Sequence, residues 1–381
     1  IIFDYNFNEE LNIELLSGYK TIIFNNYEQN EKIFEQNEKI FECFINDDFS
    51  YAKYKKSKFN QDVSKLPLGI IRLIFGYNFN QNVSNLPNTL THLAFGDNFN
   101  QDVSNLPYTL THLAFGNNFN QDASNLPHNL TNLTFNIFFN QDASNLPHTL
   151  THLTFNYWCD FNQDVSKLPQ GITHLTFGSQ FNQDVSNLSQ LITHLTFGYY
   201  FNQDVSNLPH NLTNLIFDIC FNQDVSKLPQ GITHLTFGSQ FNQDVSNLSQ
   251  SITHLTLGLC FNQQYNIPSN IEYLNLGCNN SYIIESLPNS IIELELGCYF
   301  NLQMNNLPTS IKKIVFSEFG SYDAYLNCLP DFVEELELNP KYTRRILRIP
   351  SNLKKLKCGK DYPYKDDFAM CEVEIFTCFL F

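Results

Sequence analysis

The side chains of this chain that are best suited to metal binding or proton transfer are histidines that recur at a fixed spacing. One histidine follows another about every 20 residues, within the tripeptide Thr-His-Leu, and asparagine replaces it at Asn132 and Asn214. Neighbouring imidazoles can bind a transition metal, but a closed site needs three or four converging ligands and a straight column offers two. We therefore expect no metal site. The histidines are His92, His112, His152, His174, His194, His234 and His254.

Aspartates form a second column, each two residues before a serine or its equivalent. Like charges stacked about 5 Å apart repel by roughly 0.8 kcal/mol even in water, so a local interaction has to offset them. A turn in which the carboxylate accepts backbone N–H bonds explains the pattern, and cation binding along the row is the alternative. The aspartates are Asp62, Asp102, Asp122, Asp142, Asp164, Asp184, Asp204, Asp224 and Asp244.

Other catalytic arrangements do not emerge from the sequence. It contains no recognisable Ser-His-Asp set, phosphate-binding loop, cysteine nucleophile with a base, or pair of acids in one pocket. The polar residues that recur are explained by copying of one repeat. The sequence therefore predicts a non-enzymatic protein that needs no cofactor.

The unit that positions these residues runs from Ile172 to Leu191, and we number its places from Ile172. Apolar residues stand at places one, four, six, ten, fourteen and seventeen, often with proline at eighteen. Alternation over places three to six predicts a short strand with one buried face. Glycine is common at place seven and predicts a turn with left-handed backbone. We expect the asparagine at place eleven to bond the next repeat.

A repeat of this period predicts a solenoid, because one unit cannot bury its phenylalanines alone whereas stacked units can. The expected fold is an α/β-type repeat solenoid, mostly β, of about 15 or more coils of 20 residues. One parallel sheet carries the strands, and two phenylalanine columns, at places six and ten, fill the core.

The wording F-N-Q-D-V-x-x-L-P-x-x-I-x-x-L-x-F-G resembles the FNIP repeat family, over roughly residues 59–359. The resemblance implies a leucine-rich-repeat-like, curved stack with its sheet on the concave face. It also implies a source among social amoebae or giant DNA viruses of amoebae, and an F-box before the repeats. Residues 1–58 supply no F-box signal, and the family carries over no catalytic residues.

The chain divides into five segments that differ in how closely their sequences match the repeat. Residues 1–27 are degenerate partial repeats that start mid-repeat, so we expect a fragment of a longer product. Residues 28–58 are a divergent insertion, in which a short helix is followed by a degenerate coil from Ile40. Near-identical repeats fill 59–262, diverged charged repeats fill 263–359, and residues 360–381 form a C-terminal cap. A two-residue insertion should bulge after one strand and expose Trp158.

Composition restricts the partners and the compartment. A net charge of −16 disfavours nucleic acid and anionic membrane surfaces. The sequence shows no signal peptide, no spanning apolar run and no C-x-x-C pair, so we expect an intracellular, cytoplasmic protein with reduced thiols, in the host cytoplasm if it is viral.

The predicted function is a protein–protein interaction scaffold that binds through the concave strand face. Two alternatives remain: the substrate-recruiting part of an F-box adaptor, and a structural protein that self-associates. Arg344, Arg345 and Arg348 form a candidate patch for an acidic partner, and alternating charges at places two, three and five should fix the stacking of the last coils. The candidate contact residues at place three are His152, His174, His194, His234, His254, Tyr273, Glu293, Lys313, Glu335 and Lys355.

Overall fold

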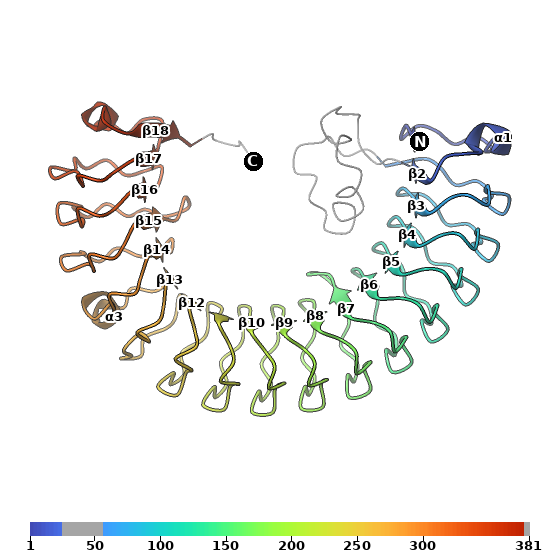
Figure 1. The fold of residues 1–381 in the computed structure, drawn as a ribbon, viewed down its shortest axis with the longest axis horizontal. Helices are drawn as coiled ribbons and strands as arrows, with labels where there is room; N and C mark the ends of the chain where they lie inside the picture. Colours follow the sequence, from blue (N-terminus) through green and yellow to red (C-terminus); the bar gives the residue numbers. More distant parts are fainter. Residues whose placement is uncertain (25–55, 377–381) are drawn as a thin grey trace. The chain divides into compact units, whose positions relative to one another are not determined.

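The computed structural model describes residues 1–24 and 56–376 (Figure 1). The described chain is a parallel β-solenoid in which successive coils each contribute one short strand, as the repeat predicts. The coils form two compact units, Ile1–Phe201 and Asn202–Phe381. Within each unit the strands line the concave side of the stack, and the irregular outer segments line the other side (Figure 1).

The strands are two to four residues long. Unit 1 holds β1 (Ile2–Phe3), helix α1 (Ile13–Leu16), β2 (Thr21–Phe24), β3 (Arg72–Ile74), β4 (His92–Ala94), β5 (His112–Ala114), β6 (Asn132–Phe135), β7 (His152–Phe155), β8 (His174–Thr176) and β9 (His194–Thr196). Unit 2 holds β10 (Asn214–Ile216), β11 (His234–Thr236), β12 (His254–Leu257), β13 (Tyr273–Leu276), helix α3 (Ser281–Glu285), β14 (Glu293–Leu296), β15 (Lys313–Phe316), β16 (Glu335–Glu337), β17 (Lys355–Cys358), the 3₁₀ helix η2 (Lys365–Phe368) and β18 (Glu372–Ile375).

All of these strands pair in parallel, place against equal place. His174 lies beside His194 and Leu175 beside Leu195, for example, and Leu235 lies beside Leu255 in unit 2. A shift of one residue would turn the buried place-four leucines toward solvent. The repeat length therefore fixes the register, and the register turns each repeated residue type into a continuous column.

Two phenylalanine columns fill the core as predicted. Within a coil the rings at places six and ten stack closely, with 3.7 Å between the centroids of Phe177 and Phe181. Between coils the spacing is wider, 5.8 Å from Phe177 to Phe197. In the last coils tyrosines continue the stack, a feature that we did not predict from the sequence; they are Tyr322, Tyr342 and Tyr362.

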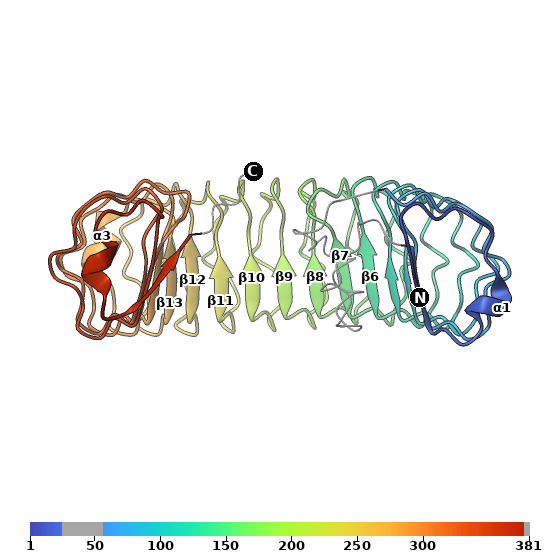
Figure 2. The same ribbon diagram turned by 90° about the horizontal axis from the view of Figure 1, so that it is seen from above.

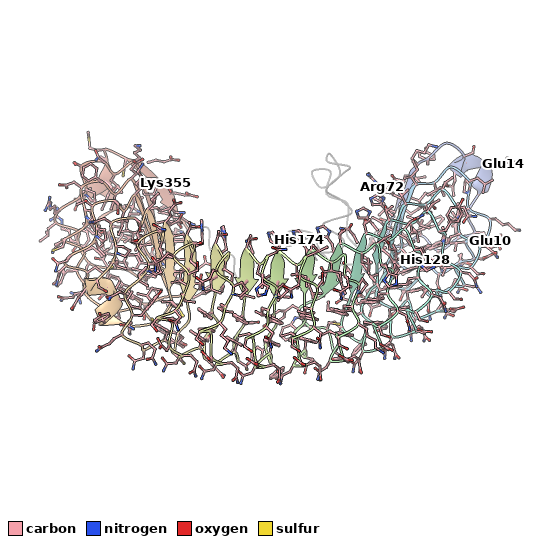
Figure 3. The ribbon with its side chains drawn as sticks, turned by 60° about the horizontal axis from the view of Figure 1, so that its bottom comes forward. Glu10, Glu14, Arg72, His128, His174 and Lys355 are labelled. Carbon is pink, nitrogen blue, oxygen red and sulfur yellow. The ribbon has the colours of Figure 1, made fainter. Side chains whose placement is uncertain are left out.

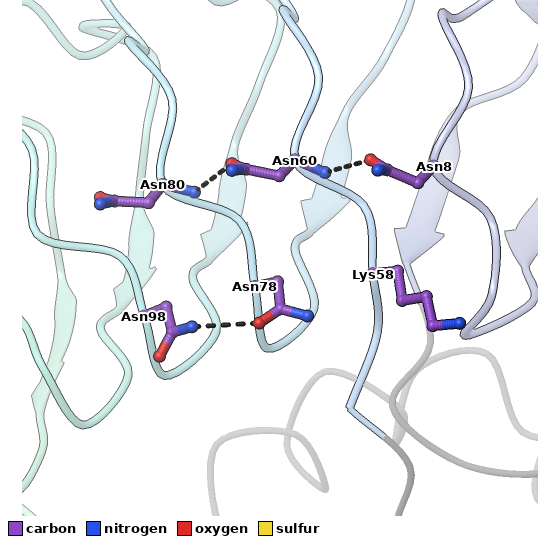
Figure 4. Close-up of a pocket in the computed structure, with 6 residues that line it drawn as sticks. All are labelled: Asn8, Lys58, Asn60, Asn78, Asn80 and Asn98. Carbon is purple, nitrogen blue, oxygen red and sulfur yellow. Dashed lines mark hydrogen bonds between the residues drawn. The ribbon is translucent and has the colours of Figure 1, made fainter.

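The place-eleven asparagines form the ladder that the sequence predicts. The side-chain Oδ1 of Asn60 accepts the backbone N–H of Asn80 at 2.8 Å (Figure 4). In the same way Asn80 accepts the backbone N–H of Asn100 at 2.9 Å. The next residue adds a contact that we had not foreseen: Gln101 donates its Nε2–H to the same oxygen of Asn80 at 3.0 Å. The pair Asn-Gln thus satisfies backbone groups outside the strands, where no sheet partner can reach.

The glycines at place seven serve a different purpose from the one expected. None of them has a positive φ. Among the glycines of the described residues, only Gly18 has one. A Cβ on Gly96 would instead lie 2.1 Å from the carbonyl oxygen of Gly76 in the preceding coil. In the coils that carry glycine at place seven, consecutive backbones approach too closely for a side chain, and the expectation of a left-handed backbone was wrong.

The first coils confirm the predicted register. Phe3 pairs with Phe24, and β2 pairs directly with β3. The ring of Phe24 stacks on that of Phe59 at 3.8 Å, the separation found between places six and ten of one coil. Those two residues are therefore neighbours within a single coil, and the sequence between them is an insertion. The expected short helix and the coil from Ile40 lie outside the described residues.

The C-terminal segment differs from a simple apolar cap. β18 continues the sheet of unit 2 by pairing with β17, and its side chains are mostly exposed. Burial at this end comes instead from Phe368 of η2, which is 2% exposed. The remaining residues of the expected cap, 377–381, are outside the described range.

Candidate functional site

Places three and five of each strand lie on the side opposite the core, because places four and six point into it. From β7 to β9 both places are half-buried or exposed, whereas in β3 to β6 the place-five residues are buried. In β8, for example, His174 and Thr176 are half-buried while Leu175 is 1% exposed. Figure 3 shows Arg72 and His174 on this face in unit 1, and Lys355 in unit 2. Here we call this set of side chains the strand face.

In unit 1 the strand face brings the predicted histidines into one stacked row. The imidazole centroids of His152 and His174 are 4.3 Å apart, and those of His174 and His194 are 4.2 Å apart. Asn132 interrupts the row, as expected, between His112 and His152. In unit 2 His234 stacks on His254 at 4.1 Å in the same way.

The threonine at place two holds each ring, which sequence reasoning missed. The Oγ1 of Thr173 lies 2.9 Å from Nδ1 of His174, and it also donates to the carbonyl oxygen of Thr151 at 3.1 Å. The same contact recurs beside His152 and His254. The repeated Thr-His pair orients the imidazole, since a hydroxyl can both donate and accept.

Burial and stacking favour the neutral imidazole. Burial, followed by the nearby His112 and Arg72, lowers the pKa of His92 to about 4. Burial, followed by His194, lowers the pKa of His152, and burial, followed by His152 and His194, lowers that of His174. Among the described residues no group of three or more His, Cys, Asp or Glu side chains converges as a metal site.

The aspartate column is explained by turns. Asp184 accepts the backbone N–H of Ser186 through Oδ1 at 2.9 Å and its hydroxyl through Oδ2 at 2.9 Å. The two serine hydrogen bonds lower the pKa of Asp102, Asp164 and Asp224. Each carboxylate therefore has a structural use within its own coil, as the capping interpretation predicts.

In unit 2 the last strands carry alternating charges, and a predicted cross-strand pair forms at each of places two, three and five. Glu293 lies 2.9 Å from Lys313 at place three, Glu334 lies 2.5 Å from Lys354 at place two, and Glu337 lies 3.2 Å from Lys357 at place five. Lys355 is closest to a residue that we did not predict, Glu374 of β18 at 2.7 Å. Tyr273 donates its hydroxyl to Glu295 at 2.5 Å.

The candidate arginine patch is paired with acidic residues of its own unit. The Nε of Arg344 is 3.3 Å from an oxygen of Asp323, Arg345 forms two bonds to Asp367, and Arg348 lies 2.8 Å from Asp331. These aspartates come from neighbouring outer segments. The patch therefore helps to hold the last coils together, and its proposed role in docking an acidic partner remains a prediction.

The lowered histidine pKa values predict acid sensitivity. The folded state disfavours protonation of these imidazoles. The free energy of unfolding is therefore unaffected by them above the unfolded pKa of about 6.5, and it falls as the pH drops from there toward 4. After a discount for solvent screening we expect a loss of roughly 1 kcal/mol from His92 at pH 5. Chemical unfolding at pH 7 and pH 5 should show a smaller loss for His92→Gln than for the wild type.

The control for this measurement is His128→Gln, which changes an exposed histidine of a turn outside the strands. It should lose as much stability as the wild type between the two pH values. An equal pH response in the His92→Gln variant would contradict the assignment of the effect to the stacked row.

The charge pairs of unit 2 predict a salt-dependent stability. Lys313→Glu places a third carboxylate between Glu293 and Glu335 and should lower the free energy of unfolding by about 1–2 kcal/mol, less in 0.5 M salt. Adding Glu293→Lys should recover part of the loss. Lys341→Glu, a charge reversal at an exposed site, should cost less than about 0.5 kcal/mol. Equal losses for Lys313→Glu and Lys341→Glu in denaturant titrations would refute the pairing role.

No helix in the described part of the chain is long and apolar enough to cross a membrane.

The FNIP Repeat family matches residues 59–98, 82–118, 99–135, 119–157, 184–220 and 279–319. No curated protein matches the chain.

One solved structure with a similar fold is a leucine-rich-repeat protein. CroV588, described as a novel circular LRR protein, superposes with a TM-score of 0.66 and 37% identity over 80% of this chain. This chain spans about half of that protein, 52% of its length.

Two further structures share 18% identity with the chain. The functional domain of InlJ from Listeria monocytogenes has a TM-score of 0.47 and covers 80% of this chain and 66% of its own. YopM from Yersinia enterocolitica has a TM-score of 0.45 and covers 77% and 74%. The matched repeats and the parallel solenoid agree with the sequence-based resemblance: this chain contains FNIP repeats and folds as a leucine-rich-repeat-like solenoid.

Proposed function

We propose that this chain is a non-enzymatic scaffold that binds a partner protein through the strand face. The observation that carries the proposal is the row of half-buried or exposed polar side chains at places three and five of β7, β8 and β9, held in register on parallel strands. A partner would meet a preformed surface, so little conformational entropy would be lost on binding.

The chemistry of the strand face suits binding better than catalysis. The imidazoles stack along a line, and the charged residues of unit 2 are paired with one another. Such a surface offers hydrogen-bond donors, acceptors and flat rings over a length of many coils, which is how repeat proteins build extended binding surfaces. The adaptor and self-associating alternatives remain compatible with this face.

The experiment isolates the strand face with two substitutions that bring the same new charge. The immobilised chain captures proteins from an amoebal lysate, mass spectrometry identifies them, and each is then purified for affinity measurement. His174→Glu alters the strand face, and Asn187→Glu alters an exposed residue of the outer segment of the same coil. We expect the first change to weaken binding about tenfold or more and the second to leave it within about twofold.

Equal affinities for the wild type and His174→Glu would reject the strand face as the binding surface. Capture of ubiquitin-ligase subunits would favour the adaptor role. Light scattering that rises with protein concentration in the absence of a partner would favour self-association.

A further inference from the structure

The turns that follow the strands vary from coil to coil, although most of the repeat is copied. Places eight and nine read Asp97-Asn98 and Asn117-Asn118 in two coils, and then Ile137-Phe138 and Tyr199-Tyr200 in others. The flanking residues Phe, Asn and Gln at places ten to twelve stay the same. These turns, together with the turns before the strands, are the places where the repeats of unit 1 differ most.

In unit 1 these turns carry large exposed rings. Phe138 is 50% exposed, Trp158 is 65% exposed and Tyr200 is 49% exposed. Tyr157 packs edge-on against Trp158 with 4.8 Å between centroids, and Tyr199 packs against Tyr200 at 4.6 Å. We define the aromatic rim as Phe138, Tyr157, Trp158, Tyr199 and Tyr200.

Parallel pairing places these turns along one edge of the unit, because every strand ends at the same side (Figure 2). Backbone hydrogen bonds between successive turns hold the rings in place. The N–H of Phe138 donates to the carbonyl oxygen of Asn117 at 2.9 Å, and that of Tyr200 donates to Ser179 at 2.9 Å. The aromatic rim is thus a preformed surface rather than a set of loose side chains.

The two-residue insertion belongs to the same surface. It adds Trp158 and Cys159, and the cysteine is fully buried, with its Sγ 3.1 Å from the carbonyl oxygen of Asn136. The buried thiol anchors the enlarged turn, so the insertion raises the tryptophan outward without disturbing the coil. The prediction that Trp158 lies on the rim is confirmed.

The stretch of chain that carries the aromatic rim is strongly acidic. Residues 76–201 contain a single basic residue, Lys167, and no arginine. Asp160 lies in the enlarged turn itself, next to the buried Cys159. The acidic residues of this stretch are Asp97, Asp102, Asp122, Asp142, Asp160, Asp164 and Asp184.

The same edge already shows how a basic side chain meets such a ring. Tyr77 occupies place eight of an earlier coil, and the ammonium group of Lys56 lies 4.1 Å from the centroid of its ring. The Nζ of Lys56 also donates to the Tyr77 hydroxyl at 2.8 Å. An ammonium or guanidinium above an aromatic face is attracted by the ring quadrupole, most strongly by tryptophan.

We propose that the aromatic rim docks a segment of a partner protein rich in lysine and arginine. The basic side chains lie against the exposed rings, and the aspartates of residues 76–201 attract the segment over a longer range. This surface is separate from the strand face, so the two proposals stand or fall on different variants.

Trp158 makes the proposal directly measurable, because it is the single tryptophan of the chain. The full chain is titrated with a peptide of ten arginines while the tryptophan emission is recorded, and with a peptide of ten glutamates as the charge control. We expect a saturable change with the arginine peptide alone. Phe138→Ser and Tyr200→Ser should each weaken binding about two- to fivefold, as expected for loss of one exposed cation–π contact.

The matched control is Tyr108→Ser, which removes a ring that is 65% exposed but lies in the turn before a strand, at the opposite edge. It should bind the peptide as the wild type does. Circular dichroism confirms that each variant is folded.

Three results would overturn the proposal. The first is a Trp158 emission that the arginine peptide does not change. The second is equal weakening of peptide binding by Tyr108→Ser and by the rim variants, and the third is an emission that changes with a neutral chito-oligosaccharide but not with the arginine peptide.

Discussion

The hydrogen bond from one coil's backbone to the asparagine side chain of the coil before it determines much of this structure. The outer segments contain no strand, so their backbone N–H groups have no sheet partner, and an unsatisfied buried group costs about 1–3 kcal/mol. The Oδ1 of Asn100 meets this need by accepting the backbone N–H of Asn120, and it also accepts the side-chain Nε2–H of Gln121. The phenylalanine beside it is fully buried in each coil, so the ladder and the stacked rings reinforce one another.

The close approach of consecutive backbones follows from the same stacking. Where the turn carries glycine, a Cβ would collide with the preceding carbonyl group, as at Gly96 and Gly198. Where it carries a larger residue, the side chain is used locally: Asn136 and Asp218 each accept the N–H of the next residue. The solenoid therefore tolerates variation in this turn, which is the edge at which the exposed rings of unit 1 are found.

Much of the fold could be predicted because it is periodic. Phe177 and Phe181 are buried, and His174 lies beside His194, because equal places must align when coils stack. Contacts that depend on the path of the outer segment could not be predicted. The pairing of Arg345 with Asp367, for example, joins two residues whose proximity depends on how neighbouring outer segments pack, and the partner of Lys355 is set by β18. Glycine was misjudged because its steric role appears only when two coils are placed together.

The most direct test of this account is hydrogen exchange at the place-eleven amides. We expect the N–H of Asn100, which lies outside any strand, to be protected as strongly as the strand amide of Leu93. Asn80→Ala removes its acceptor and should restore rapid exchange at Asn100 while Asn140, two coils further on, remains protected by Asn120. Exchange of the wild-type Asn100 amide at the rate of an open turn would show that the side-chain ladder does not hold the coils together.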